Sequence, residues 1–379
     1  MKKIFKLLAV LSFASFSFVS CDLTLMPEDE TSPDKYFKTE SDLQLWSNQF
    51  YKDILLSAEY GSSTDVFLSN GVSAYVTGNR TPQTQSWSFT SLREINYMLE
   101  HLHQCEDAGV AKKYEAVGRF FRAYFYFKMV RQYGDMPWYD YVIGSSDTES
   151  LNKPRDPRGY VMMKVLEDCD KAYERLPEAW GSGPLFHVSK NAAMALKARA
   201  ALFEGTFRKY HAGTEFVPQD QQVFEDKTIS STWFLQEAVS AAEKVIGKKA
   251  LYTGNTMGIA GKATNASYRE YFVLEVADPT ETIFARAYNS DEIVQVRHGI
   301  QFDYKNHKHS ATTRFVNHYL KNDGTAYTEA ELATMSYFDA FKGRDPRMAQ
   351  TIQGPGYIAI GETAPEKLSM ERTLNGYRV

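Results

Sequence analysis

Apolar residues recur at the three- and four-residue spacing of amphipathic helices along most of the chain. We expect one helix with Ser41 as its N-cap and a second that starts at Ser91. A third carries apolar side chains on several faces and ends at Gly134, so it must pack between neighbouring helices. The three apolar stripes are Leu43, Trp46, Phe50 and Ile54; Leu92, Ile95, Leu99 and Leu102; and Ala116, Phe120, Ala123, Phe127 and Val130.

Three further helices follow. Asp156 is expected to cap the first, with Pro157 at its N1 position, and Ser189 to cap the second. The second helix and the segment 234–247 have faces of small side chains, which allow two helix axes to approach closely. We therefore predict a mostly α-helical fold of hairpins like those of tetratricopeptide repeats (TPR). The stripe of the first helix is Val161, Val165, Cys169, Ala172 and Leu176, and the small faces are Ala195, Ala198, Leu202 and Gly205, and Ala238, Ala241, Ala242 and Val245.

Long segments without a helical period separate these helices, at residues 57–90, 206–232 and 248–312. They are rich in Ser, Thr, Gly and Asn, and the alternating residues 281–287 predict a short strand. Loops of this length in a compact protein usually carry function.

The N-terminus has the pattern of a secretory signal, with lysines at its start and an apolar run over residues 7–19. That run is too short to span a bilayer as a helix. Because Cys21 follows directly, we predict a lipoprotein with a signal peptide at 1–20 and a lipidated tether at 21–35; the alternative is an ordinary cleaved signal. Cys105 and Cys169 are expected to be buried free thiols, with a disulfide as the alternative.

Composition and motifs exclude several functions. A net charge of −4 and the absence of basic clusters argue against nucleic acid as a partner. The chain contains no phosphate-binding loop, GxSxG or HExxH motif, so neither an enzyme nor a cofactor is indicated. His307 and His309 lack a third ligand and do not indicate a metal.

The segment GRFFRAYFYFKMVRQYGDMPWY at residues 118–139 is specific: it resembles the long helix and exit turn of the SusD/RagB family of outer-membrane lipoproteins. RDPRGYVMMKVLEDCDKAYERLP, VSKNAAMALKARAALFEG and FKGRDPRMAQTI resemble further family phrases and occur in the family's order.

The resemblance implies TPR-like helix pairs with irregular loops and a few short strands. It implies a helical N-terminal region at 36–215 and a C-terminal region at 216–379. It also implies a surface lipoprotein that captures oligo- or polysaccharide for a SusC-like TonB-dependent transporter, without catalysis. Because family members run longer after the RDPR phrase, we expect the C-terminal region to be truncated.

A saccharide site needs aromatic faces together with amides, carboxylates or Arg, presented on loops. By this criterion we expect the ligand to contact the following loop residues: Asn70, Tyr75, Asn79, Arg80, Tyr288, Asn289, Tyr304 and His307. Trp46, Trp87 and Trp233 are instead expected to pack against helices. The sequence leaves two other functions open: a peptide-capturing, RagB-like protein and a TPR-type scaffold for partner proteins.

Overall fold

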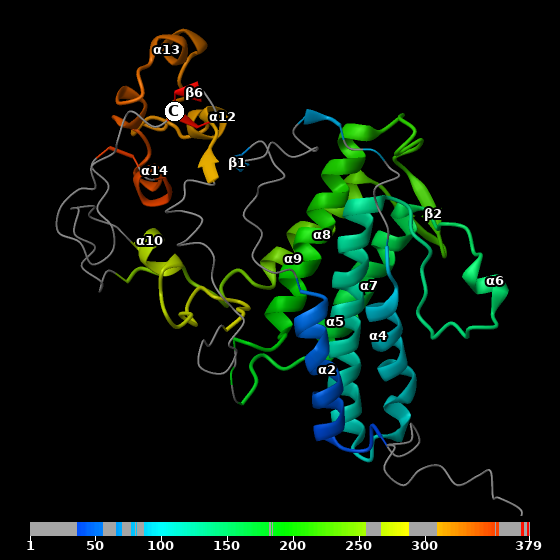
Figure 1. Cartoon of the computed structure of the whole chain (residues 1–379). Coiled ribbons are helices and arrows are strands. Elements are labelled where there is room, and N and C mark those ends of the chain that lie inside the picture. Colours follow the sequence, from blue (N-terminus) through cyan, green and yellow to red (C-terminus); the bar gives the residue numbers. More distant parts are fainter. Residues whose placement is uncertain are drawn as a thin grey trace, which may run out of the picture.

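The computed structural model describes residues 36–55, 66–69, 77–79, 81, 87–181, 183, 185–254, 267–287, 309–352, 354–355, 373–374 and 377–378. The structure is mostly helical, as predicted (Figure 1). Its long helices lie side by side in one half: α2 (Glu40–Asp53), α4 (Thr90–His101), α5 (Ala108–Tyr133), α7 (Arg158–Arg175), α8 (Lys190–His211) and α9 (Ser231–Glu243).

Shorter elements make up the rest of the described structure. The one-turn helices are η3 (Leu102–Gln104), α6 (Thr148–Leu151) and η4 (Asp339–Phe341). Four short helices lie in the second half of the chain: α10 (Ser267–Phe272), α12 (Thr313–Asn317), α13 (Glu329–Thr334) and α14 (Pro346–Thr351). Antiparallel two-stranded ladders pair β1 (Phe67–Ser69) with β4 (His309–Ala311), β2 (Gln222–Phe224) with β3 (Lys227–Ile229), and β5 (Thr373–Leu374) with β6 (Tyr377–Arg378).

The long helices stack in chain order. Helix α5 packs against α2 and α4 on one side and against α7 on another, α7 packs against α8, and α8 packs against α9. This succession of neighbouring helices confirms the predicted TPR-like hairpins.

Helix α5 is the centre of the hydrophobic core. Asp107 caps it by accepting hydrogen bonds from the backbone N–H groups of Gly109 and Val110, and it ends at Gly134, whose φ is 76°. That positive φ is why a glycine stands there. The whole predicted stripe is buried, and so are Phe121 and Phe125 on other faces, because helices surround α5.

Two predicted helix caps are wrong. Thr39, not Ser41, caps α2, in a reciprocal capping box with Asp42. Asp156 does not cap α7, because its backbone pairs with that of Met136 and its carboxylate accepts the Trp138 N–H. The α7 stripe from Val161 to Leu176 is buried as predicted, and Ser189 caps α8 as predicted.

The contact between α8 and α9 uses small residues, as predicted. A Cβ atom built on Gly205 would lie 2.8 Å from Cγ of Leu235, so only glycine allows this approach. Ala201 on α8 is buried, as are Ala238 and Ala241 on α9. Leu202 was expected on this face, but it is 53% exposed, because α7 and α9 bury adjacent stripes of α8 and leave Leu202 outside both.

The predicted strand at residues 281–287 is not formed. The Ala285 N–H instead donates to the carbonyl of Leu185, in the connection between α7 and α8, and Ile283 and Phe284 pack partly buried on the helical core. The alternating pattern therefore reflects packing on helices and not pairing with a strand.

Cys105 and Cys169 are free thiols, as predicted, but they differ in exposure. Cys169 is fully buried, and burial raises the pKa of its thiol well above the ordinary value, whereas Cys105 is only partly buried. In a Cys21→Ser variant we expect a thiol reagent to label Cys105 in the native protein and Cys169 only after unfolding. Mass spectrometry of the labelled peptides checks this prediction. Equal labelling of both cysteines in the native protein would contradict the burial of Cys169 on α7.

Candidate functional site

Most loop residues predicted to contact a ligand lie outside the described residues. Asn79 is described, and it is exposed next to Gly78. The predicted residues that lie outside are Cys21, Asn70, Tyr75, Arg80, Tyr288, Asn289, Tyr304 and His307. The described chain does contain two cavities, between helices of the N-terminal half, that the sequence analysis did not anticipate.

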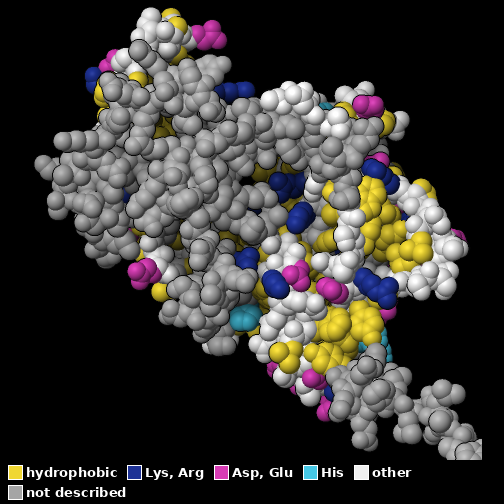
Figure 2. Space-filling model, in the orientation of Figure 1, with side chains coloured by type: hydrophobic (Ala, Val, Ile, Leu, Met, Phe, Trp, Pro, Cys, Tyr) yellow, Lys and Arg dark blue, Asp and Glu magenta, His cyan; other side chains and the backbone are white. Residues whose placement is uncertain are grey.

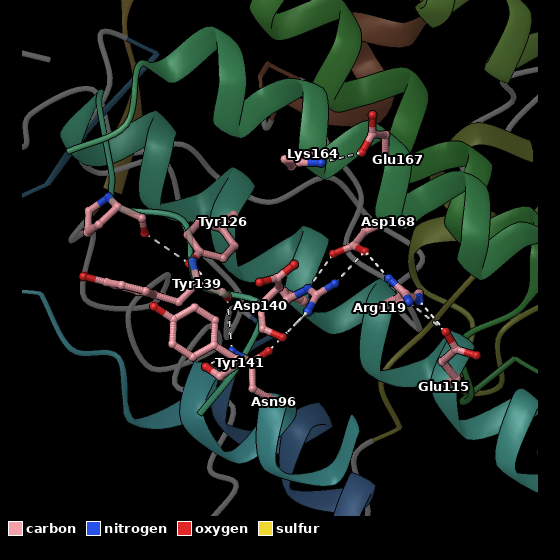
Figure 3. Close-up of polar contacts among 12 residues, drawn as sticks. Asn96, Glu115, Arg119, Tyr126, Tyr139, Asp140, Tyr141, Lys164, Glu167 and Asp168 are labelled. Atoms are coloured by element: carbon pink, nitrogen blue, oxygen red, sulfur yellow. Dashed lines mark hydrogen bonds and ion pairs between the residues drawn. The ribbon is translucent and has the colours of Figure 1, made fainter. Parts of the chain in front are cut away.

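The first is a polar pocket of about 400 Å³ between α4, α5 and α7 (Figure 3). Part of its wall is the turn that follows α5 at residues 134–141, which we call the exit turn of α5. Its lining residues are Leu99, Glu100, Leu102, Glu115, Arg119, Arg122, Trp138, Asp140, Lys164, Glu167, Asp168 and Lys171.

Asp168, on α7, is the hub of this pocket. Its carboxylate accepts hydrogen bonds from Nε and Nη2 of Arg122 at 2.6 and 2.9 Å and from Nη1 of Arg119 at 3.0 Å. Asp168 is only 2% exposed, and Arg122 is also buried. Burial lowers the pKa of Arg122, but the attraction of Asp168 outweighs it, so the net shift is upward and the guanidinium stays charged.

The network continues to the exit turn of α5. Arg122 donates to the side-chain oxygen of Asn96 at 3.3 Å, and the Asn96 amide donates to the carbonyls of Tyr139 and Tyr141. The Tyr126 hydroxyl donates to the carbonyl of Pro137 and accepts from the Tyr139 N–H, and burial raises its pKa. These bonds tie the turn to α4 and α5.

Trp138 completes the wall of the polar pocket. Its ring stacks on Tyr126, with centroids 4.4 Å apart, and the Arg122 guanidinium lies 5.3 Å from its centroid. Its Nε1 is the single buried side-chain polar atom without a hydrogen-bond partner in the part of the chain that the structure describes.

The sequence contained a signal for this network. Arg122 interrupts the apolar and aromatic run at residues 120–127 of α5, and a buried charge needs a partner of opposite sign. Arg119 and Arg122 pair with Asp168 and so join α5 to α7, whereas Lys164 pairs with Glu167 on its own helix and with Glu225 between β2 and β3.

The second cavity is an aromatic groove of about 600 Å³ between α2 and α4. Its lining residues are Tyr36, Phe37, Trp46, Thr90, Arg93, Glu94 and Tyr97. Trp46 was predicted to pack against helices, and it does contact the core, but part of its ring faces this groove. The other two predicted packing residues also keep some exposure: Trp87 lies edge-on to Tyr133, and Trp233 to Phe234.

Neither a membrane-spanning helix nor a metal cluster is found among the described residues. None of their helices is both long and apolar enough to cross a bilayer. Within the same ranges, no three His, Cys, Asp or Glu side chains are grouped closely enough to hold a metal ion.

The sequence and fold of this chain are similar to those of one family of known proteins. The SusD-like family model described as starch-binding, associating with the outer membrane, matches residues 37–202, which include α2, α4, α5, α7 and most of α8. The curated SusD-like protein P2 of Formosa agariphila is 24% identical over 283 residues, covering 69% of this chain and 54% of that protein.

Two solved structures share the fold. A SusD-like protein from Bacteroides fragilis NCTC 9343 has a TM-score of 0.59 at 19% identity, covering 86% of this chain and 62% of its own. A SusD-like carbohydrate binding protein from the same organism has a TM-score of 0.57 at 16% identity, covering 83% of this chain and 59% of its own. The chain thus spans about half to three fifths of the length of these relatives. Residues 37–202 match the SusD-like family in sequence, and the helical fold of the chain agrees with that of solved SusD-like proteins.

Proposed function

We propose that this protein is a surface lipoprotein that binds oligo- or polysaccharide at the outer membrane and has no catalytic role of its own. The observation that carries the proposal is the family match over residues 37–202, whose model is described as starch-binding and associated with the outer membrane. The same role is supported by a protein of similar fold from Bacteroides fragilis, which is described as a SusD-like carbohydrate binding protein.

The proposed anchor is a lipid on Cys21, which follows the signal-like N-terminal run. The proposed partner is a SusC-like TonB-dependent transporter that receives the captured glycan for import. The proposed ligand contacts are the predicted loop residues, with Tyr75 as an aromatic face and Asn79 and Arg80 as hydrogen-bonding groups.

Calorimetry of the chain from residue 22 onward tests the ligand class. We expect saturable heat with one class of soluble polysaccharide, and Tyr75→Ala to weaken that binding about tenfold, because stacking on one aromatic ring contributes roughly 1–2 kcal/mol. Tyr210→Ala is the matched control, since Tyr210 is 75% exposed near the end of α8 and is not among the predicted ligand contacts. Binding of oligopeptides alone would instead favour a peptide-capturing, RagB-like protein.

A further inference from the structure

The aromatic groove between α2 and α4 has the chemistry of a ligand site. On α4, four of its lining residues stand at the i, i+3, i+4, i+7 spacing of one helix face: Thr90, Arg93, Glu94 and Tyr97. This face is distinct from the one that buries Leu92 and Ile95 in the core. Figure 2 shows hydrophobic side chains gathered over the region of α2 and α4, with acidic and basic side chains beside them.

The rings of the groove are held in fixed orientations. Trp46 and Tyr97 stack with centroids 5.5 Å apart, and Tyr36 lies 6.0 Å from Trp46 at an angle of 59°. The Trp46 indole N–H donates to the backbone carbonyl of Glu94 at 3.0 Å. This bond joins α2 to α4 and fixes the indole, so the aromatic wall is formed before any ligand arrives.

The polar groups of the groove keep hydrogen-bonding capacity for a ligand. Burial, followed by repulsion from Asp53, raises the pKa of the Glu94 carboxyl. Among the residues that the structure describes, none donates a hydrogen bond to that carboxylate. Arg93 donates from Nη1 to the carbonyl of Ile143, and its Nε and Nη2 have no hydrogen-bond acceptor within the described ranges.

The charges in the groove narrow the class of ligand. An anion would meet the Glu94 carboxylate, and a cation such as a quaternary ammonium would meet the Arg93 guanidinium. A neutral ligand with several hydroxyl groups can donate a hydrogen bond to the Glu94 carboxylate and accept one from the Arg93 guanidinium. Its apolar C–H face can pack against the aromatic rings. The cavity of about 600 Å³ lies within the usual range for small-molecule sites.

We propose that this groove is a second saccharide site, in which a neutral sugar ring lies against Trp46 and Tyr36 while Arg93 and Glu94 bind its hydroxyls. The inference rests on the proposed glycan-binding function, but it uses the helical half of the protein instead of the predicted loops. A chain with two separate sites would bind a long polysaccharide more tightly than either site alone.

Fluorine NMR of protein labelled with 5-fluorotryptophan tests this site directly, because the chain has 5 Trp residues and Trp46→Phe assigns one resonance. The probes are maltoheptaose, cellohexaose and xylohexaose. We expect at least one to shift the Trp46 resonance saturably, and Arg93→Ala with Glu94→Gln to weaken its half-saturation about tenfold, as the loss of two hydrogen bonds implies. Arg175→Ala with Glu174→Gln, at the exposed end of α7, is the matched control and should change nothing.

The possible outcomes separate the two proposals. If calorimetry shows glycan binding but the Trp46 resonance does not move, or moves only when Tyr75 is intact, the groove is not a second site and the proposed function stands. If choline chloride moves the resonance and no glycan does, the groove binds cations and the inference is wrong. If no glycan gives heat or a shift, both proposals fall.

Discussion

Replacing Glu204 with glutamine is expected to lower the free energy of unfolding by about 3–5 kcal/mol. Glu204, on α8, is completely buried between two arginines that are also buried, Arg158 and Arg208. Its carboxylate accepts hydrogen bonds from Nη2 of Arg158 at 2.7 Å and from Nε of Arg208 at 2.9 Å. The substitution keeps the shape but leaves two cations without their counter-charge.

The surroundings of the Glu204 cluster leave the arginines little room to escape to water. The Arg158 guanidinium lies 3.5 Å from the ring centroid of Phe207, and Arg208 passes so close to α7 that a Cβ on Gly159 would lie 1.9 Å from its Nη2. Arg208 also donates to the Asp220 carbonyl and to the Gln222 side chain, which join the segment after α8 to this cluster.

Urea denaturation followed by circular dichroism measures the effect of Glu204→Gln. Glu225→Gln is the control, because the Lys164–Glu225 pair is partly exposed and its loss should change the stability by less than about 1 kcal/mol. Replacing all three members of the cluster, as Arg158→Met, Glu204→Leu and Arg208→Met, should recover part of the loss. A Glu204→Gln variant as stable as Glu225→Gln would show that the buried charges do not hold α7 and α8 together.

Asp168→Asn is the second substitution with a large expected effect, also about 3–5 kcal/mol. Asp168 is the shared acceptor of Arg119 and Arg122, and Arg122 in turn supports Asn96 and the ring of Trp138. We therefore expect the variant to lose stability and to loosen the exit turn of α5 before it unfolds globally.

Hydrogen exchange resolves that local effect of Asp168→Asn. The Tyr139 N–H, which donates to the Tyr126 hydroxyl at 2.6 Å, should exchange faster in the variant, while amides in the middle of α8 should follow only the global change. Glu115→Gln is the control, since Glu115 is partly exposed and pairs with Arg119 on the same helix. Unchanged protection of Tyr139 in Asp168→Asn would separate the turn from the charge network.

The parts of the fold that the sequence predicted are those set by local periodicity. The stripe of α5 from Ala116 to Val130 and that of α7 from Val161 to Leu176 are buried because a repeat of three and four residues places them on one side. Ser189 was predicted correctly because serine is a preferred N-cap residue, and its side chain accepts a hydrogen bond from the Ala192 N–H.

Several errors arose where tertiary contacts decide the structure. Asp156 looks like a cap in sequence, but its pairing with Met136 draws it into the exit turn of α5. Leu202 lies on the outside because α8 has two neighbouring helices, which periodicity along one helix cannot show. The groove around Trp46 depends on how α2 lies against α4, so residue spacing within either helix could not predict it.

Native affinity electrophoresis asks directly whether this SusD-like chain captures glycans. The chain from residue 22 onward is run through gels that each contain one soluble polysaccharide, with Tyr75→Ala and the Arg93→Ala, Glu94→Gln variant alongside. We expect one class of polysaccharide to retard the wild-type chain and to retard both variants less. Equal migration in every gel, together with binding to oligopeptides in solution, would contradict glycan capture.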